Sequence, residues 1–166
     1  MQTIAFERVI RKDEERTYFT LPFEVPEGIE RLDIRYDYPR RVAREENGAT
    51  VVEEINIVDL ALTAGNGEYV GASGSDRTHI YISAYESAQG YAAVPISAGT
   101  WQIIVGAYKV APEGVTVRYE ITLTEKTLRR FQGDTHMHTT GSDGTLSIPE
   151  LVDLCRKQRL DFAIIT

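Results

Sequence analysis

Alternation of apolar and polar residues runs through most of this chain and then stops. Up to about Lys126, short segments place β-branched and aromatic residues at every second position, the pattern of β-strands with one buried face. The clearest segments are Ile29–Tyr38, Ile55–Leu62, Thr78–Tyr85, Trp101–Lys109 and Val115–Thr124. Turn-forming residues separate them, and Asn66-Gly67 predicts a tight hairpin. This pattern predicts a mainly β fold, an antiparallel β-sandwich.

After Gln132 the pattern changes to that of a helix. Ser147 and Glu150 are spaced as a capping box, with Pro149 in the first turn, where it needs no N–H partner. The next apolar residues fall on one face of a helix: Ile148, Leu151, Val152 and Cys155. A helix is therefore expected to begin just after Ser147.

One strand is expected before this helix and one after it. One lies near residues 130–135, and the continuous apolar run Phe162–Ile165 is typical of a strand covered on both faces. A strand–helix–strand unit of this kind implies parallel strands. We therefore expect a sandwich domain over residues 1–128 and the beginning of a second domain over 129–166.

Composition excludes several classes of protein. The 166 residues carry a formal net charge of -7, which argues against a nucleic-acid-binding surface. The single cysteine, Cys155, allows no intramolecular disulfide and fits a reducing compartment. No signal peptide and no apolar stretch approaching 18 residues is visible, so we expect a cytoplasmic protein with no membrane partner.

The residues that suggest chemistry lie at the end of the expected strand near residue 135. His136 and His138 are two apart, so on an extended strand both imidazoles point to the same side. Asp143 follows a short loop containing Gly141 and Gly144, which can return its carboxylate toward the histidines. Two imidazoles and a carboxylate favour zinc, manganese or iron over calcium. The spacing predicts His136, His138 and Asp143 as ligands of a divalent transition metal.

Two other residues that could take part in chemistry also have simpler, structural interpretations. Asp134 is either a carboxylate that supports the metal ligands without binding the ion or a turn residue at the strand edge, and the sequence favours neither. His79, the only other histidine, lies alone in an alternating strand and is interpreted as non-functional.

The segment from Gly133 to Thr166 resembles the start of the PHP (polymerase and histidinol phosphatase) superfamily. The matching features are a His-x-His-Thr motif at His136-Met137-His138-Thr139, then Ser142-Asp143-Gly144, a capped helix and a strand ending in Ile165-Thr166. The resemblance implies a (β/α)₇ barrel that hydrolyses phosphate or other esters at a centre of two or three metals. It also implies ligand roles for His136, His138 and Asp143.

A softer similarity covers the earlier part of the chain. The stretches Asp59–Leu62, Gly99–Trp101 and Gly106–Val115 look like the β-sandwich that precedes the PHP domain in the carbaryl-esterase-like branch. The chain ends at Thr166, where the resemblance places an Asp-His pair next, and the later ligands of that family are absent. We therefore expect an incomplete metal site and no normal hydrolase activity from this chain alone.

Two other functions stay open at this stage. The sandwich could be a ligand- or carbohydrate-binding module that uses Tyr81, Tyr85, Tyr91 and Trp101, although core packing is the favoured interpretation of these aromatics. It could also have a purely structural role. The apolar run Phe162–Ile165 presents an edge that could pair with another copy of the chain, so a homo-oligomer is expected.

Overall fold

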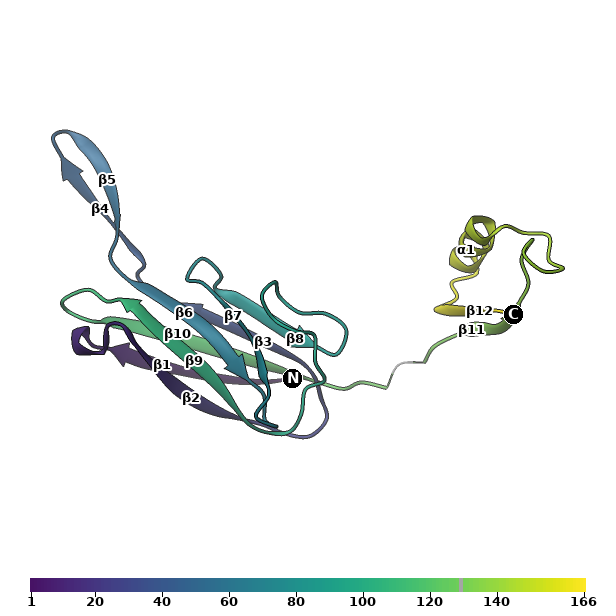
Figure 1. Cartoon of the computed structure of the whole chain (residues 1–166), viewed down its shortest axis with the longest axis horizontal. Helices are drawn as coiled ribbons and strands as arrows, with labels where there is room; N and C mark the ends of the chain where they lie inside the picture. The colour runs from purple at the N-terminus through teal and green to yellow at the C-terminus, as the bar shows by residue number, and fades with distance from the viewer. Residues whose placement is uncertain (129) are drawn as a thin grey trace. The chain divides into compact units, whose positions relative to one another are not determined.

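A computed structural model describes residues 1–128 and 130–166. The chain divides into two compact units, Met1–Lys126 and Thr127–Thr166, so the boundary falls two residues before the position expected from the sequence. Each unit is described by itself (Figure 1).

The first unit is built from two four-stranded antiparallel sheets. The first sheet has the order β1-β10-β3-β8, formed by Gln2–Ile10, Val115–Glu125, Ile29–Asp37 and His79–Ser83. The second has the order β2-β9-β6-β7, formed by Thr17–Val25, Gly99–Lys109, Ile57–Thr63 and Tyr69–Ser73. The two sheets face each other (Figure 1), and buried side chains from both sheets form one hydrophobic cluster, so the predicted mainly β, antiparallel class is confirmed.

The core of this unit follows from the alternation in the sequence. On β9, Trp101, Ile103, Val105 and Ala107 are buried, and on β6 so are Val58, Leu60 and Leu62. Burying one such side chain contributes about 1.5–3 kcal/mol, so a core of this extent accounts for most of the driving force for folding. Nearly every apolar residue assigned to an inner face by its period lies in this single cluster.

The short connections use the turn chemistry expected of them. Strands β6 and β7 form an antiparallel hairpin, in which Gly67 adopts a φ of 82° and its N–H donates to the carbonyl of Ala64. The predicted hairpin at Asn66-Gly67 is thus confirmed. A single 3₁₀ turn, η1 (Lys12–Glu14), joins β1 to β2.

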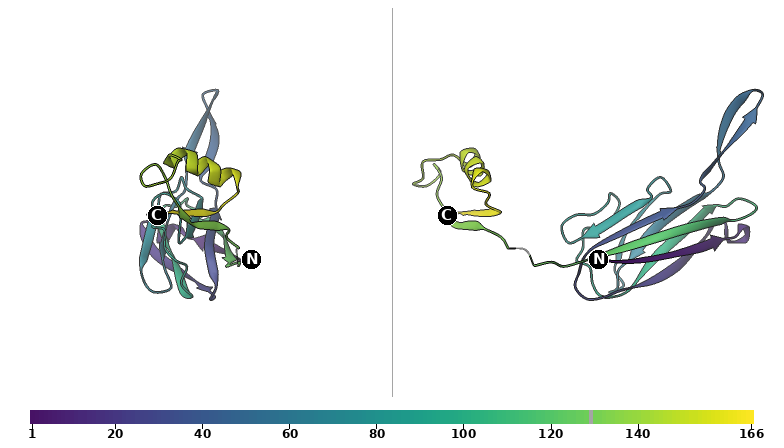
Figure 2. Two further views of the ribbon diagram at one scale, coloured as in Figure 1. Left: turned by 90° about the vertical axis from the view of Figure 1, so that its right-hand side faces the viewer. Right: turned by 180° about the vertical axis from the view of Figure 1, so that it is seen from behind.

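A separate two-stranded hairpin extends from one end of the sandwich (Figure 2). It consists of β4 (Arg41–Glu46) and β5 (Ala49–Glu54), which pair only with each other. Asn47 and Gly48 at its tip have φ values of 52° and 77°, as a two-residue hairpin turn with primed geometry requires. We call residues 41–54 the arm.

The second unit contains a strand, a helix and a strand. Strand β11 (Gly133–Met137) and strand β12 (Phe162–Ile165) pair in parallel, and α1 (Ile148–Lys157) connects them. The expected parallel pairing is confirmed, although the first strand begins at residue 133 rather than near 130. None of the helices in the described part of the chain is long and apolar enough to span a membrane.

Candidate metal centre

The two predicted histidines converge at the carboxyl end of β11. The pairing of β11 with β12 shifts register between Asp134 and Met137, the stretch that contains His136. The imidazole rings of His136 and His138 lie edge to face with centroids 4.8 Å apart. Their Nε2 atoms face each other at 3.0 Å. The expectation that both side chains lie on one side of the chain is confirmed.

The other nitrogen of each ring contacts an oxygen. The Nδ1 atom of His138 lies 2.7 Å from Oδ1 of Asp143 and 3.2 Å from Oγ of Ser142. The Nδ1 atom of His136 lies 3.3 Å from Oγ1 of Thr166, the residue that follows β12. Oxygen partners on the outer ring nitrogen are typical of histidines that bind metals, because they fix the tautomer and the direction of the ring.

This arrangement determines where the ring lone pairs point. When Nδ1–H of His138 donates to Asp143, its Nε2 carries a lone pair that points at His136. Without a metal, an N–H on Nε2 of His136 satisfies that lone pair. A tetrahedral ion with bonds of about 2.0–2.1 Å would hold two ligand nitrogens about 3.3 Å apart, close to the distance between these two atoms.

Backbone hydrogen bonds shape the loop that carries Asp143. The carbonyl of Thr139 accepts from the N–H groups of Ser142 and Gly144, at 2.9 and 3.0 Å. A Cβ atom on Gly144 would come within 2.5 Å of the carbonyl carbon and oxygen of His138. Glycine is therefore required here by close backbone approach, and this approach brings Asp143 to the imidazole of His138.

Asp143 does not occupy the place between the two Nε2 atoms. Its carboxylate lies on the opposite side of the His138 ring and is 84% exposed. Within residues 1–128 and 130–166, no group of three or more His, Cys, Asp or Glu side chains is arranged to hold one ion. The structure thus brings His136 and His138 together, and it places Asp143 as the partner that orients His138.

Asp134 supports the strand that carries the histidines. Its Oδ1 accepts a hydrogen bond from the backbone N–H of His136 at 2.9 Å. This contact corresponds to the turn or strand-edge interpretation, because Asp134 binds the backbone of His136 and not its imidazole ring.

The helix and strand around the site are fixed by local contacts. The carboxylate of Glu150 accepts from the backbone N–H and the hydroxyl of Ser147, at 2.8 and 2.6 Å, which lowers the pKa of Glu150. The predicted cap is confirmed by these bonds. On the inner side of α1, Sγ of Cys155 lies 3.8 Å from Sδ of Met137, the residue between the two histidines.

Two residues at the site were not identified from the sequence. Ser142 and Thr166 both contact an Nδ1 atom, but serine and threonine are too common for their presence to predict such contacts. The position of Thr166, directly after a strand parallel to β11, was the available signal, because parallel strands end at the same edge of a sheet.

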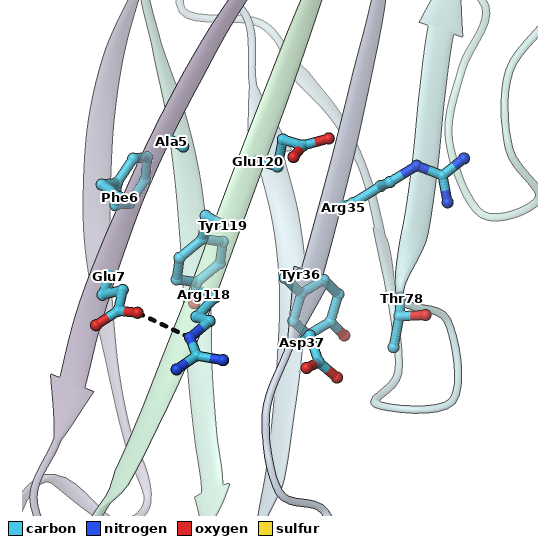
Figure 3. A pocket seen from close by; sticks show the side chains of 10 residues that line it. All are labelled: Ala5, Phe6, Glu7, Arg35, Tyr36, Asp37, Thr78, Arg118, Tyr119 and Glu120. Atoms are coloured by element: carbon cyan, nitrogen blue, oxygen red, sulfur yellow. Dashed lines mark hydrogen bonds and ion pairs between the residues drawn. The ribbon is translucent and has the colours of Figure 1, made fainter.

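The sandwich has a surface pocket on its first sheet, lined by charged and aromatic side chains and not by a histidine pair (Figure 3). Its lining comes from β1, β3, β10 and the residue before β8: Ala5, Phe6, Glu7, Arg35, Tyr36, Asp37, Thr78, Arg118, Tyr119 and Glu120. The guanidinium of Arg118 pairs with Glu7 at 2.8 Å, and both side chains are largely exposed. Acidic and basic groups alternate across the pocket, so it presents no concentrated charge toward a ligand.

The aromatics considered for ligand binding divide into two groups. Trp101 and Tyr91 are buried in the core, and the indole N–H of Trp101 donates to the carbonyl of Ser97 at 2.8 Å. The core interpretation is confirmed for these two residues. Tyr85 is 95% exposed, and Tyr81 lies under the guanidinium of Arg31. These four residues do not form one aromatic platform.

Comparison with known proteins shows little similarity. No protein-family model and no curated protein matches the chain. One solved structure with some likeness is the Glycosylation Associate Protein (Gap123) complex from Streptococcus agalactiae, at 11% identity and a TM-score of 0.32. The alignment covers 99% of this chain and 52% of that one, so this chain spans about half the length of that protein.

Proposed function

We propose that residues 133–166 are the first metal-binding segment of a PHP-type metal-dependent hydrolase that acts on phosphate or other esters. In this proposal His136 and His138 bind a zinc, manganese or iron ion through their Nε2 atoms. The observation that supports it most strongly is the 3.0 Å separation of these atoms, with an oxygen partner on each Nδ1.

The position of the histidines in the second unit also supports the proposal. They lie where β11 ends and its loop begins, which is where barrel and open α/β enzymes place their catalytic groups. The parallel pairing of β11 with β12 through α1 is the repeating unit of such folds. A barrel is the larger structure to which we assign this unit.

Each residue has a role that follows from its contacts. His136 and His138 hold the ion, and Asp143 keeps Nδ1 of His138 protonated so that its Nε2 lone pair is free. Asp134 holds the backbone of His136 in place. A bound divalent ion would polarise the ester oxygen and lower the pKa of a water molecule.

Two imidazoles alone leave most coordination positions of the ion to other groups. Catalytic zinc sites use three protein ligands and structural sites use four. We therefore expect this chain to bind a metal ion without turning over substrate. An assay with p-nitrophenyl phosphate should give no rate above that of the His136→Ala variant, and a rate well above it would contradict this expectation.

Metal titration tests the proposed ligands. Isothermal titration of the chain with Zn²⁺ should show one binding event that His136→Ala or His138→Ala abolishes. His79→Ala is the matched control, because His79 also contacts a carboxylate, Asp33 at 2.9 Å, but lies in the sandwich. Equal binding by the wild-type chain and His138→Ala would refute the proposal. Loss of binding in His79→Ala alone would move the site to the sandwich.

A further inference from the structure

The arm exposes backbone edges and apolar side chains on both of its strands' outer sides, without a covering layer. Its two strands pair only with each other, so each has one edge without a partner strand. Of its residues, only Val42 and Glu54 are even half-buried. Val51 and Val52 are 43% and 61% exposed. An isolated two-stranded hairpin is at best marginally stable in water.

The base of the arm is nevertheless fixed firmly to the sandwich. Asn56 is buried, donates to the carbonyl of Pro39 at 2.7 Å and accepts from the N–H of Ala111 at 2.8 Å. Arg40 pairs with Glu54 and donates to the carbonyl of Ser75 at 3.1 Å. These bonds hold the residues that flank the arm, together with its last residue, Glu54, so the base of the arm is fixed.

The two edges of the arm differ in their protection against strand pairing. Strand β4 carries charges at Arg41, Arg44, Glu45 and Glu46, and charged side chains discourage the addition of another strand. Strand β5 has an uncharged run, Ala49–Val52, with Thr50 and two valines that favour β-structure. The edge of β5 is therefore the one open to a partner strand.

We infer that the arm pairs with the arm of a second copy of this chain, β5 against β5. A two-fold axis perpendicular to the sheet relates antiparallel strands and keeps each side chain on its own face. With the axis at Val51, this valine lies opposite Val51 of the second copy, and Thr50 lies opposite Val52. Glu53 then lies opposite Ala49, so no two like charges face each other.

This register is favoured over its neighbour. Moving the axis to Val52 would place Glu53 opposite Val51 and Glu54 opposite Thr50, so that each of these charges faces an uncharged residue and Val52 facing Val52 is the one apolar pair left. Pairing at Val51 extends the arm from two strands to four, in the order β4-β5-β5-β4. Sheets of three or more strands are far more stable than a lone hairpin.

Within the first unit, the arm and the last residues of β10 lie at opposite ends of the first sheet. The arm follows β3 at the end where Asp37 pairs with Arg118, whereas Glu125 at the close of β10 pairs with Ile29 at the other end of the sheet. The arm is therefore remote from the last strand residues of the first unit. This inference is independent of the metal proposal.

Sedimentation equilibrium over a micromolar concentration series tests the dimer. The wild-type chain should reach twice the mass of one chain, whereas Val51→Lys should stay at the mass of one chain. Ile164→Lys is the matched control, a similarly exposed residue on β12, and it should still dimerise. A monomeric wild type, an undiminished Val51→Lys dimer, or a monomeric Ile164→Lys would each overturn the inference.

Two further variants test the position of the axis. A mixture of Val51→Lys and Val51→Glu should dimerise although neither does alone, because opposite charges then face each other. In a Cys155→Ser background, Val51→Cys should form a disulfide-linked dimer under oxidation, and Glu54→Cys should not. Cross-strand Cα atoms about 4.5–5.5 Å apart are within the disulfide range. Equal cross-linking by both cysteine variants would refute this register.

Discussion

The two units of the chain differ in how completely they bury apolar residues. In residues 1–126 the inner faces of two sheets cover each other, and side chains such as Trp101 and Leu62 are fully buried. In the described part of residues 127–166, Leu151 is the only buried apolar residue, and all four residues of β12 are exposed. Both units contain apolar runs, so the difference shows that burial requires a second layer as well as the right period. Parallel strands normally have layers on both faces.

Separating the units should give the largest difference. We expect a fragment of residues 1–126 to fold with a cooperative thermal transition, because its core is complete. A fragment of residues 127–166 should remain unfolded, since domains below about 40 residues rarely fold without metals, disulfides or partners. Circular dichroism and proton NMR of each fragment measure this. A cooperative thermal transition in the isolated fragment of residues 127–166 would refute the distinction between the units.

A matched pair of leucine substitutions should give the next largest effect. Leu62→Ala should lower the free energy of unfolding of the sandwich by about 2–5 kcal/mol, as cavity formation in a packed core does. Leu151→Ala removes the same atoms from the second unit and should leave that transition unchanged. Denaturant titration followed by the fluorescence of Trp101 reports the sandwich alone. A similar loss in both variants would show that the units unfold together.

Two buried tyrosines in the sandwich core differ in whether their hydroxyl groups have a hydrogen-bond partner. Tyr36 and Tyr119 lie opposite each other on β3 and β10 with rings stacked at 6.0 Å, and burial raises the pKa of both phenols. The hydroxyl of Tyr36 donates to the carbonyl of Val58 at 3.1 Å, whereas that of Tyr119 has no partner in the described residues.

Removing each hydroxyl should therefore have unequal effects. Tyr36→Phe should cost about 1 kcal/mol, and Tyr119→Phe should be neutral or stabilising because it removes an unsatisfied buried group. Chemical denaturation of the two variants measures the difference. Equal destabilisation would show that the Tyr119 hydroxyl makes a bond comparable to that of Tyr36.

The smallest expected effect is on thermal stability, and it concerns two histidine–carboxylate pairs: His79–Asp33 in the first unit and His138–Asp143 in the second. Burial alone would raise the pKa of Asp33, but hydrogen bonds from Arg31 and His79 hold it below its ordinary value of 3.8. Its stabilising effect should therefore be present above about pH 4 and disappear as the pH falls through the lowered pKa.

Substitution of each carboxylate tests this contrast. Asp33→Asn should lower the melting temperature of the sandwich at pH 7, by an amount equivalent to at most about 1 kcal/mol, and the difference should vanish near pH 2. Asp143→Asn should not change that transition at any pH, because Asp143 pairs with His138 in the second unit. Thermal melts at several pH values distinguish these outcomes, and a deficit for Asp33→Asn that grows toward acid pH would contradict the account.

The strands of the sandwich could be predicted where one face is buried. Alternation located β3, β6, β8, β9 and β10 because the core imposes a period of two on their sequences. The arm was not predicted, since neither of its faces is buried and its sequence carries no alternation. Asn47-Gly48 is a turn-forming pair, but a turn by itself does not predict two flanking strands. Strand order was also beyond the sequence, because pairs such as β1 with β10 join residues more than a hundred positions apart.

The arrangement of the two histidines could be predicted in part for a related reason. The i, i+2 spacing alone places His136 and His138 on one side, since it depends only on an extended backbone. The position of Asp143 depends on the whole loop, in particular on the contact of Gly144 with the backbone of His138. Sequence spacing could show that a carboxylate returns to the histidines, but not which ring nitrogen it meets.

X-ray absorption spectroscopy of the Zn²⁺-loaded chain tests the central claim most directly. If His136 and His138 share one ion, the wild-type spectrum should contain two imidazole ligands at about 2.0–2.1 Å. His138→Ala should show one fewer imidazole, and His79→Ala should match the wild type. A wild-type spectrum with a single imidazole, or with none, would contradict the claim that the two histidines form a shared metal site.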